Sequence, residues 1–213
     1  MPSPLITRPG RTAILPPQYC GQVGYYALLA SYPRAVIDLA MPYDKRRKSA
    51  HRCSIADVRG PLTLTVPIEK AHRGMTWADV CVSSHAGWWS DHAVSLESAY
   101  GRTPYFEFYY DRFKPLLTPP APGLTVGDLD RALDQIIRQI LALDTEVTYY
   151  VEEQPDAIDD YRRQTNFDIE NAPAYYQVRA DRLGFIPNLS ILDLIFNLGP
   201  ESPLLLHRIL QKA

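Results

Sequence analysis

The densest cluster of charge in the chain has the residue types of an anion-binding site. Between Asp44 and Cys53 there are five cations and one acid. Arginine forks and lysine charges near the end of a strand are well suited to holding phosphate or carboxylate. A solvated basic turn is the simpler alternative. The residues that we expect to form the site are Tyr43, Lys45, Arg46, Arg47 and Arg52.

A second group of residues would suit nucleophilic chemistry by a cysteine. Cys20 lies at the predicted start of a helix, where the dipole and free amides stabilise a thiolate. Gln18 would supply an oxyanion donor, and His51 or His92 would act as the base. Cys53 is an alternative nucleophile. No local motif fixes these partners, and cysteines in such positions are commonly small core residues.

Three more residues occupy positions typical of ligand sites. Asp38 ends a predicted strand, where α/β sheets collect ligands, and with Tyr43 it would position or deprotonate an acceptor. Trp88 lies off the apolar stripe of its helix and is a candidate for contacting a sugar. Asn188 follows Pro187 and would orient a loop over the site or bond its own backbone.

We predict neither a metal nor a cofactor. The five histidines are widely spread, and none forms an HxxxH or Cys-His cluster. Nothing resembling GxGxxG lies between the first two predicted strands, so a dinucleotide site is not supported.

Composition limits the class of protein. With 46% hydrophobic and 22% charged residues in 213, the chain reads as one globular domain over 1–213, with an N-terminal arm over 1–11. A net charge of −2 gives no sign of nucleic-acid binding, and no apolar run is long enough for a membrane. Three widely spaced cysteines and no signal peptide favour the cytoplasm. The oligomeric state is not determined by the sequence.

The predicted elements must bring these residues together. A strand over 12–15, a helix over 20–32 and a strand over 35–39 suggest a βαβ-like opening. Strands over 51–55 and 62–66 follow, with a turn between them. These features favour an α/β or α+β fold, with a small mixed sheet from the N-terminal half covered by C-terminal helices.

The C-terminal half is predicted to be mainly helical. The strongest pattern, over 126–143, begins with Thr125 and Asp128 as a cap related to the capping box. Ser190 is the predicted N-cap of a later helix that Gly199-Pro200 ends. Residues 152–173 are polar and irregular, and are interpreted as a long loop or a lid. The other predicted elements are helices over 89–100, 105–113 and 203–210, a strand over 147–151 and a short strand over 80–82.

Four stretches resemble the WbqC-like family. The first is Leu15-Pro16-Pro17 with Tyr25 and Tyr26 after it. The second runs from Tyr43-Asp44-Lys45 through His51-Arg52-Cys53 to Leu64-Thr65-Val66-Pro67. The third runs from Trp89 to Phe106 and contains Tyr100-Gly101-Arg102-Thr103-Pro104. The fourth is the run from Phe185 to Leu194, with Asn197 and Gly199-Pro200. Together they extend from about Ile14 to Leu210.

This resemblance implies a bacterial protein of polysaccharide or natural-product gene clusters. It suggests a transferase-like protein that modifies sugars or transfers acyl or aminoacyl groups. The expected partner is an anionic small molecule such as a nucleotide sugar or an acyl carrier, bound by Gln18, Lys45, Arg46, Arg52, Trp88 and Asn188. A non-enzymatic ligand-binding or assembly protein of the same pathway is the alternative, and a Cys-His acyl transferase is the third.

Overall fold

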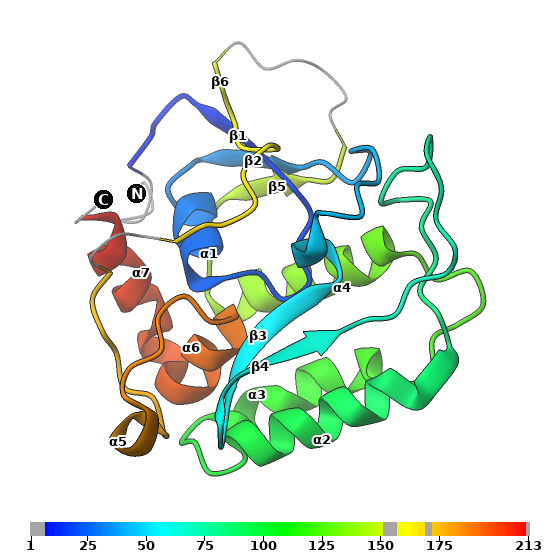
Figure 1. Cartoon of the computed structure of the whole chain (residues 1–213). Helices are drawn as coiled ribbons and strands as arrows, with labels where there is room; N and C mark the ends of the chain where they lie inside the picture. The colour runs from blue at the N-terminus through cyan, green and yellow to red at the C-terminus, as the bar shows by residue number, and fades with distance from the viewer. Residues whose placement is uncertain (1–6, 151–156, 169–171, 212–213) are drawn as a thin grey trace.

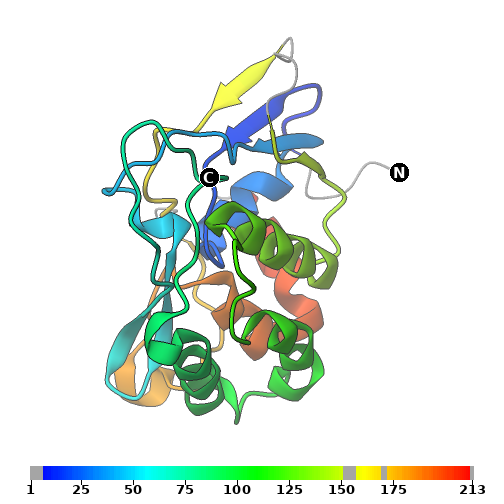
Figure 2. The ribbon, with the colours of Figure 1, turned by 90° about the vertical axis from the view of Figure 1, so that its right-hand side faces the viewer.

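A parallel sheet lies at one end of the computed structural model, which describes residues 7–150, 157–168 and 172–211 (Figure 1). Its strands are β1 (Thr12–Leu15), β2 (Arg34–Ile37), β5 (Glu146–Thr148) and β6 (Ile158–Asp160), in the order β5-β2-β1-β6. Every pairing in it is parallel. The helices gather on one side of the sheet (Figures 1 and 2), so the predicted α/β architecture is confirmed, although the sheet is parallel and not mixed as the sequence predicted.

The first βα unit is almost entirely apolar. All four residues of β1 are buried. Helix α1 (Val23–Ala30) is buried on nearly every side, as expected for a helix that is hydrophobic all round. The sequence predicts this helix from Cys20, but it begins three residues later. The chain turns at Cys20, whose φ of 44° lies outside the right-handed helical region.

Strand β6 lies within the stretch that the sequence predicts to be irregular. Residues 152–156 and 169–171 of that stretch lie outside the described residues, whereas Ile158–Asp160 pair with β1. Two of the three strand residues are acids. Arg11 Nε and the Tyr32 hydroxyl each donate to Asp159 at 2.7 Å, and Arg162 bonds Asp160 at 2.8 Å. Because these contacts neutralise the acids, a polar segment joins the sheet, which is therefore not built from the N-terminal half alone.

A separate antiparallel hairpin extends away from the parallel sheet. It consists of β3 (Arg52–Asp57) and β4 (Gly60–Thr65), and the short 3-10 helix η1 (Lys48–Ala50) leads into it. Ser54 pairs with Thr63 and Arg52 with Thr65. These side chains share one face because strand side chains alternate.

An aromatic cluster joins the C-terminal helices. Phe196 lies 5.3, 5.0 and 6.0 Å, between ring centroids, from Tyr100, Phe106 and Phe113. The remaining helices are η2 (His85–Gly87), α2 (Trp88–Tyr100), α3 (Phe106–Phe113), η3 (Lys114–Leu116), α4 (Val126–Ile140), α5 (Ala180–Leu183), α6 (Ile191–Leu198), η4 (Gly199–Glu201) and α7 (Ser202–Leu210). Within the described ranges, no helix has the length and apolar character of a membrane span.

Both helix caps predicted from the sequence are present. The Thr125 hydroxyl accepts a hydrogen bond from the Asp128 amide at 3.0 Å and begins α4. The Ser190 hydroxyl accepts from the Leu192 amide at 3.3 Å and begins α6. Each cap satisfies one of the free amides that every helix start exposes.

Candidate functional site

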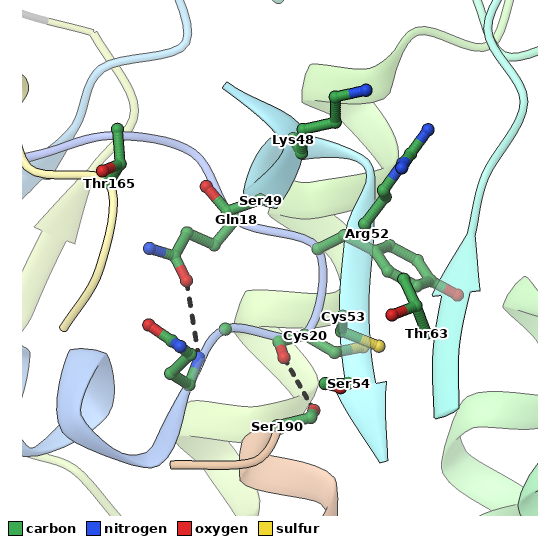
Figure 3. Close-up of a pocket in the computed structure, with 13 residues that line it drawn as sticks. Gln18, Cys20, Lys48, Ser49, Arg52, Cys53, Ser54, Thr63, Thr165 and Ser190 are labelled. Atoms are coloured by element: carbon green, nitrogen blue, oxygen red, sulfur yellow. Dashed lines mark hydrogen bonds between the residues drawn. The ribbon is translucent and has the colours of Figure 1, made fainter. Parts of the chain in front are cut away.

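A cavity of about 320 Å³ lies beyond the carboxyl end of β1 (Figure 3). Strands β2 and β5 lie on one side of β1, in that order outwards, and β6 pairs with β1 on its other side. Open parallel sheets bind ligands outside the carboxyl ends of their strands, where the strand order reverses in this way. The loop after β1 supplies Gln18–Gln22 to the wall, and Thr165 follows β6. We call this the first cavity.

Hydrogen bonds between distant segments hold the wall of the first cavity together. The Tyr19 amide donates to Ser49 O at 2.9 Å, which fixes the loop after β1 against η1. The Ser190 amide donates to Ser54 O at 2.8 Å, and its hydroxyl donates to Cys20 O at 2.7 Å. The residue that caps α6 therefore also joins β3 to the loop after β1.

Three residues that line this cavity each carry a polar atom without a partner in the described part of the chain, and each of these atoms can donate a hydrogen bond. Gln18 Nε2, Ser49 Oγ and Arg52 Nε are buried and have no hydrogen-bond partner among the described residues. Figure 3 shows Lys48 beside Arg52, with both side chains extending in the same direction. A buried donor without an acceptor costs about 1–3 kcal/mol, so a bound group with acceptor oxygens would remove that cost. The arrangement suits an oxyanion.

Two cysteines lie at the wall of the first cavity, and both are buried. Hydrogen bonding to Cys53 and burial raise the pKa of the Cys20 thiol well above its usual range. Cys20 also precedes α1, whose N-cap is Gln22, so the start of the helix does not activate it as the sequence suggested. These features keep Cys20 a protonated thiol.

Neither histidine proposed as a base is hydrogen-bonded to a thiol among the described residues. His51 Nδ1 donates to Val66 O at 2.9 Å, and its ring stacks on Trp77. His92 Nε2 donates to Thr65 O at 3.1 Å, while Nδ1 accepts from the Tyr19 hydroxyl at 2.8 Å. Burial lowers the pKa of both rings. The geometry therefore gives no support to a Cys-His pair.

We predict that Cys20 and Cys53 react slowly with iodoacetamide in the native protein at pH 8, because both thiols are buried and the raised pKa of Cys20 also limits its ionisation. The half-buried Cys81 provides an internal reference and should be alkylated first. Peptide mass spectrometry at timed intervals, with and without urea, measures all three rates. Alkylation of Cys20 ahead of Cys81 in the folded protein would contradict the prediction and support Cys20 as a nucleophile.

We also predict that His92 makes the fold less stable in mild acid. Burial lowers its pKa to about 4, whereas the ordinary value is 6.5. The unfolded state binds more protons between these pH values, so stability present above pH 6.5 is lost as the pH falls, by about 2 kcal/mol at pH 5. Urea unfolding at pH 7 and pH 5 should show a smaller difference for His92→Gln than for the natural protein. If the free energy of unfolding changed equally between pH 7 and pH 5 in both proteins, His92 would not be the group responsible.

The structure brings together only part of the predicted anion site. Arg52 and Gln18 line the first cavity. Arg46 instead pairs with Asp44 at 3.1 Å, Lys45 is exposed, and neither lines this cavity. Tyr43 packs edge-on against Trp77 at 5.1 Å between ring centroids. Arg47 donates to the carbonyls of residues 162 and 164, which attaches the basic loop to the segment after β6.

The other predicted ligand residues hold segments of the chain in place. Asp38 is buried after β2, and its carboxylate accepts from Arg162 at 2.9 Å. Trp88 is buried, and its indole N–H donates to Ser83 O at 2.9 Å. The Asn188 side chain donates to Asn166 at 3.2 Å and also to Asp168. None of the three lines the first cavity.

Several lining residues were not singled out as site residues from the sequence. Ser54 carried a usable signal, because strand alternation places it on the same face as Arg52. Thr165 carried no such signal, since the strand before it was not predicted. The lining residues missed in this way are Tyr19, Gly21, Gln22, Lys48, Ser49, Ser54, Thr63, Thr165 and Ser190.

The lining of the first cavity contains no carboxylate and no imidazole within the described ranges. It offers hydroxyl, amide, thiol, ammonium and guanidinium groups. Such groups bind and orient an anion and stabilise negative charge as it develops. Across the same ranges, no group of three or more histidine, cysteine or carboxylate side chains is placed to hold a metal.

Comparison with protein-family models gives a match to the WbqC-like protein family over residues 16–165. Every described lining residue of the first cavity except Ser190 falls within this range. The stretch from Phe185 to Pro200, on which part of the sequence resemblance rested, lies outside it. No curated protein and no solved structure matches the chain.

Proposed function

The chain belongs to the WbqC-like protein family, and from this premise we propose that it is a cytoplasmic transferase-like protein acting on an anionic small molecule. The substrate would be a nucleotide sugar or the arm of an acyl carrier. The pathway would be the synthesis of a bacterial surface polysaccharide or a secondary metabolite. The observation that carries the proposal is a set of three polar atoms on residues that line the first cavity, which have no partner among the described residues: Gln18 Nε2, Ser49 Oγ and Arg52 Nε.

The first cavity would hold the charged part of the substrate. Arg52 and Lys48 would balance its negative charge, since guanidinium groups match phosphate and carboxylate in shape. Gln18 and Ser49 would donate to oxygens that gain charge as the group is transferred. At about 320 Å³ the cavity is at the small end of the usual range for ligand pockets. It would therefore bury one end of a nucleotide sugar and leave the rest at the mouth.

One observation favours the alternative of a non-enzymatic ligand-binding or assembly protein. The described lining lacks the carboxylate or imidazole that general acid–base catalysis commonly uses. A binding protein would need the same donors and no base. Turnover separates the two: the transferase releases a modified acceptor, whereas the binding protein returns its ligand unchanged. The Cys-His acyl transferase would need a base that the described geometry does not place beside either thiol.

A thermal-shift screen tests the proposal. The panel holds nucleotide sugars, acyl-CoA and simple anions at physiological salt, because low salt exaggerates surface electrostatics. A ligand at a hundred times its dissociation constant should stabilise the fold by about 2.7 kcal/mol. We expect one ligand class to shift the transition both in the natural protein and in Arg112→Ala, which changes an exposed residue of α3. No shift with any class would contradict the proposal.

A further inference from the structure

A second and larger cavity, of about 680 Å³, lies at the far end of the β3–β4 hairpin. Its wall combines the hairpin turn at Val58, the last turn of α2 and the segment from Val178 to Arg182. Figure 1 shows these elements side by side, with the hairpin tip close to the end of α2 and to α5. The two cavities share no described lining residue, and the proposed function does not use the second one.

Three arginines line the second cavity: Arg102, Arg179 and Arg182. Glu97 and Asp181 also line it, so cations outnumber acids by one. Among the described residues, none of the three guanidinium groups forms a salt bridge with a carboxylate, either these two or any other. Three guanidinium groups that line one cavity, with no salt bridge to any of them in the described part of the chain, suit an oxyanion ligand.

Arg179 is held in place by the fold. Its Nη2 donates to Ser98 O at 2.6 Å, while Nε is buried and has no acceptor within the described part of the chain. The segment before it is fixed as well. The Tyr175 hydroxyl donates to Asp193 at 2.6 Å, and Gln177 Nε2 donates to the same carboxylate at 2.9 Å. An oxygen ligand would supply the acceptor that Arg179 Nε lacks.

The acids and the size of the cavity narrow the class of ligand. A free phosphate ion would fill only a small part of the space. Carboxylates accept hydrogen bonds and repel a second phosphate, so Glu97 and Asp181 suit the hydroxyl groups of the ligand rather than its charge. Val58, which is 44% exposed, adds an apolar contact at the mouth.

We propose that the second cavity binds a phosphorylated polyhydroxy compound of the sugar-phosphate class, with its phosphate on Arg102, Arg179 and Arg182. Strand β3 separates this site from the first cavity: Arg52 at its start lines one, and Val58 just beyond its end lines the other. Six strand residues span roughly 20 Å, so the two sites are distinct. The protein would thus bind two anionic molecules at once.

Isothermal titration with glucose 6-phosphate and with inorganic phosphate at physiological salt tests this proposal. The variants Arg102→Gln and Arg182→Gln change exposed side chains, so the fold should be retained. Each is expected to weaken glucose 6-phosphate binding at least tenfold. Arg52→Gln in the first cavity and Arg112→Gln on α3 serve as matched controls, and binding at the second cavity should stay within twofold in both.

Each outcome of the titrations either supports or contradicts a sugar-phosphate site in the second cavity. Tenfold tighter binding of glucose 6-phosphate than of phosphate, lost in Arg102→Gln and Arg182→Gln, supports the site. Equal affinity for the two probes would contradict the sugar-phosphate assignment. Binding that disappears only in Arg52→Gln, or no binding to the natural protein, would overturn the second site. Because Arg52 and Arg102 are tested separately, a failure here is distinguishable from a failure of the first cavity.

Discussion

Replacing Arg52 by alanine should lower the affinity for the ligand of the first cavity about 100-fold, or roughly 3 kcal/mol. Arg52 Nε is buried in the cavity wall with no acceptor among the described residues, and Lys48 is the other cation that lines it. A hydrogen bond to a charged group contributes about 1.5–3 kcal/mol, and a bidentate arginine adds a second bond. Titration calorimetry with the ligand that the screen identifies measures the change.

Arg46→Ala is the matched control for this experiment. Arg46 belongs to the same basic stretch, but it is exposed, pairs with Asp44 and does not line the first cavity. Its removal should change the affinity less than twofold. Circular dichroism checks that both variants are folded. If Arg46→Ala lost the ligand and Arg52→Ala kept it, the ligand would be bound by the basic loop instead.

Replacing Asp134 by alanine should destabilise the protein by about 3–5 kcal/mol. Asp134 is buried on α4 and accepts from Arg138 Nε at 2.8 Å, from the Tyr149 hydroxyl at 2.8 Å and from the Tyr26 hydroxyl at 3.3 Å. The substitution leaves a largely buried guanidinium without its counterion. It also removes the contact that joins α4 to α1 and to the segment after β5.

Urea unfolding at pH 7 measures this loss, with Asp111→Ala as the control. Asp111 pairs with Lys114 at 2.6 Å on the surface, and its side chain is 74% exposed. Exposed ion pairs contribute about 0–1 kcal/mol, so the control should change stability little. Similar losses in the two variants would show that the buried network does not hold these elements together.

The elements that could be predicted from the sequence are those with a local cause. Strand β1 is buried throughout and apolar from Ala13 to Leu15, and α4 and α6 begin with the side-chain caps that their sequences indicate. Strand β6 could not be predicted, because Asp159 at its centre is bonded by Arg11 and Tyr32, residues more than a hundred positions away. Likewise, the turn at Cys20 depends on a backbone conformation that cysteine seldom adopts.

The candidate site was predictable where side-chain direction followed from secondary structure. Arg52 is a strand residue, and the alternation of side chains along a strand predicts which face it lies on. That face lines the first cavity. The direction of Lys45 and Arg46 could not be inferred in the same way, because loop side chains follow local pairing such as that with Asp44. Asp38 directly follows β2, close to where the sequence placed it, but it forms a salt bridge with Arg162, and Arg162 follows the strand that was missed.

The most direct test of the account is a crystal structure of the protein with the ligand that gives the largest thermal shift. We expect its anionic group to accept hydrogen bonds from Arg52 in the first cavity, with a further oxygen bound to Gln18 or Ser49. A ligand bound elsewhere, with those three donors left without acceptors, would contradict the claim that the first cavity is the functional site.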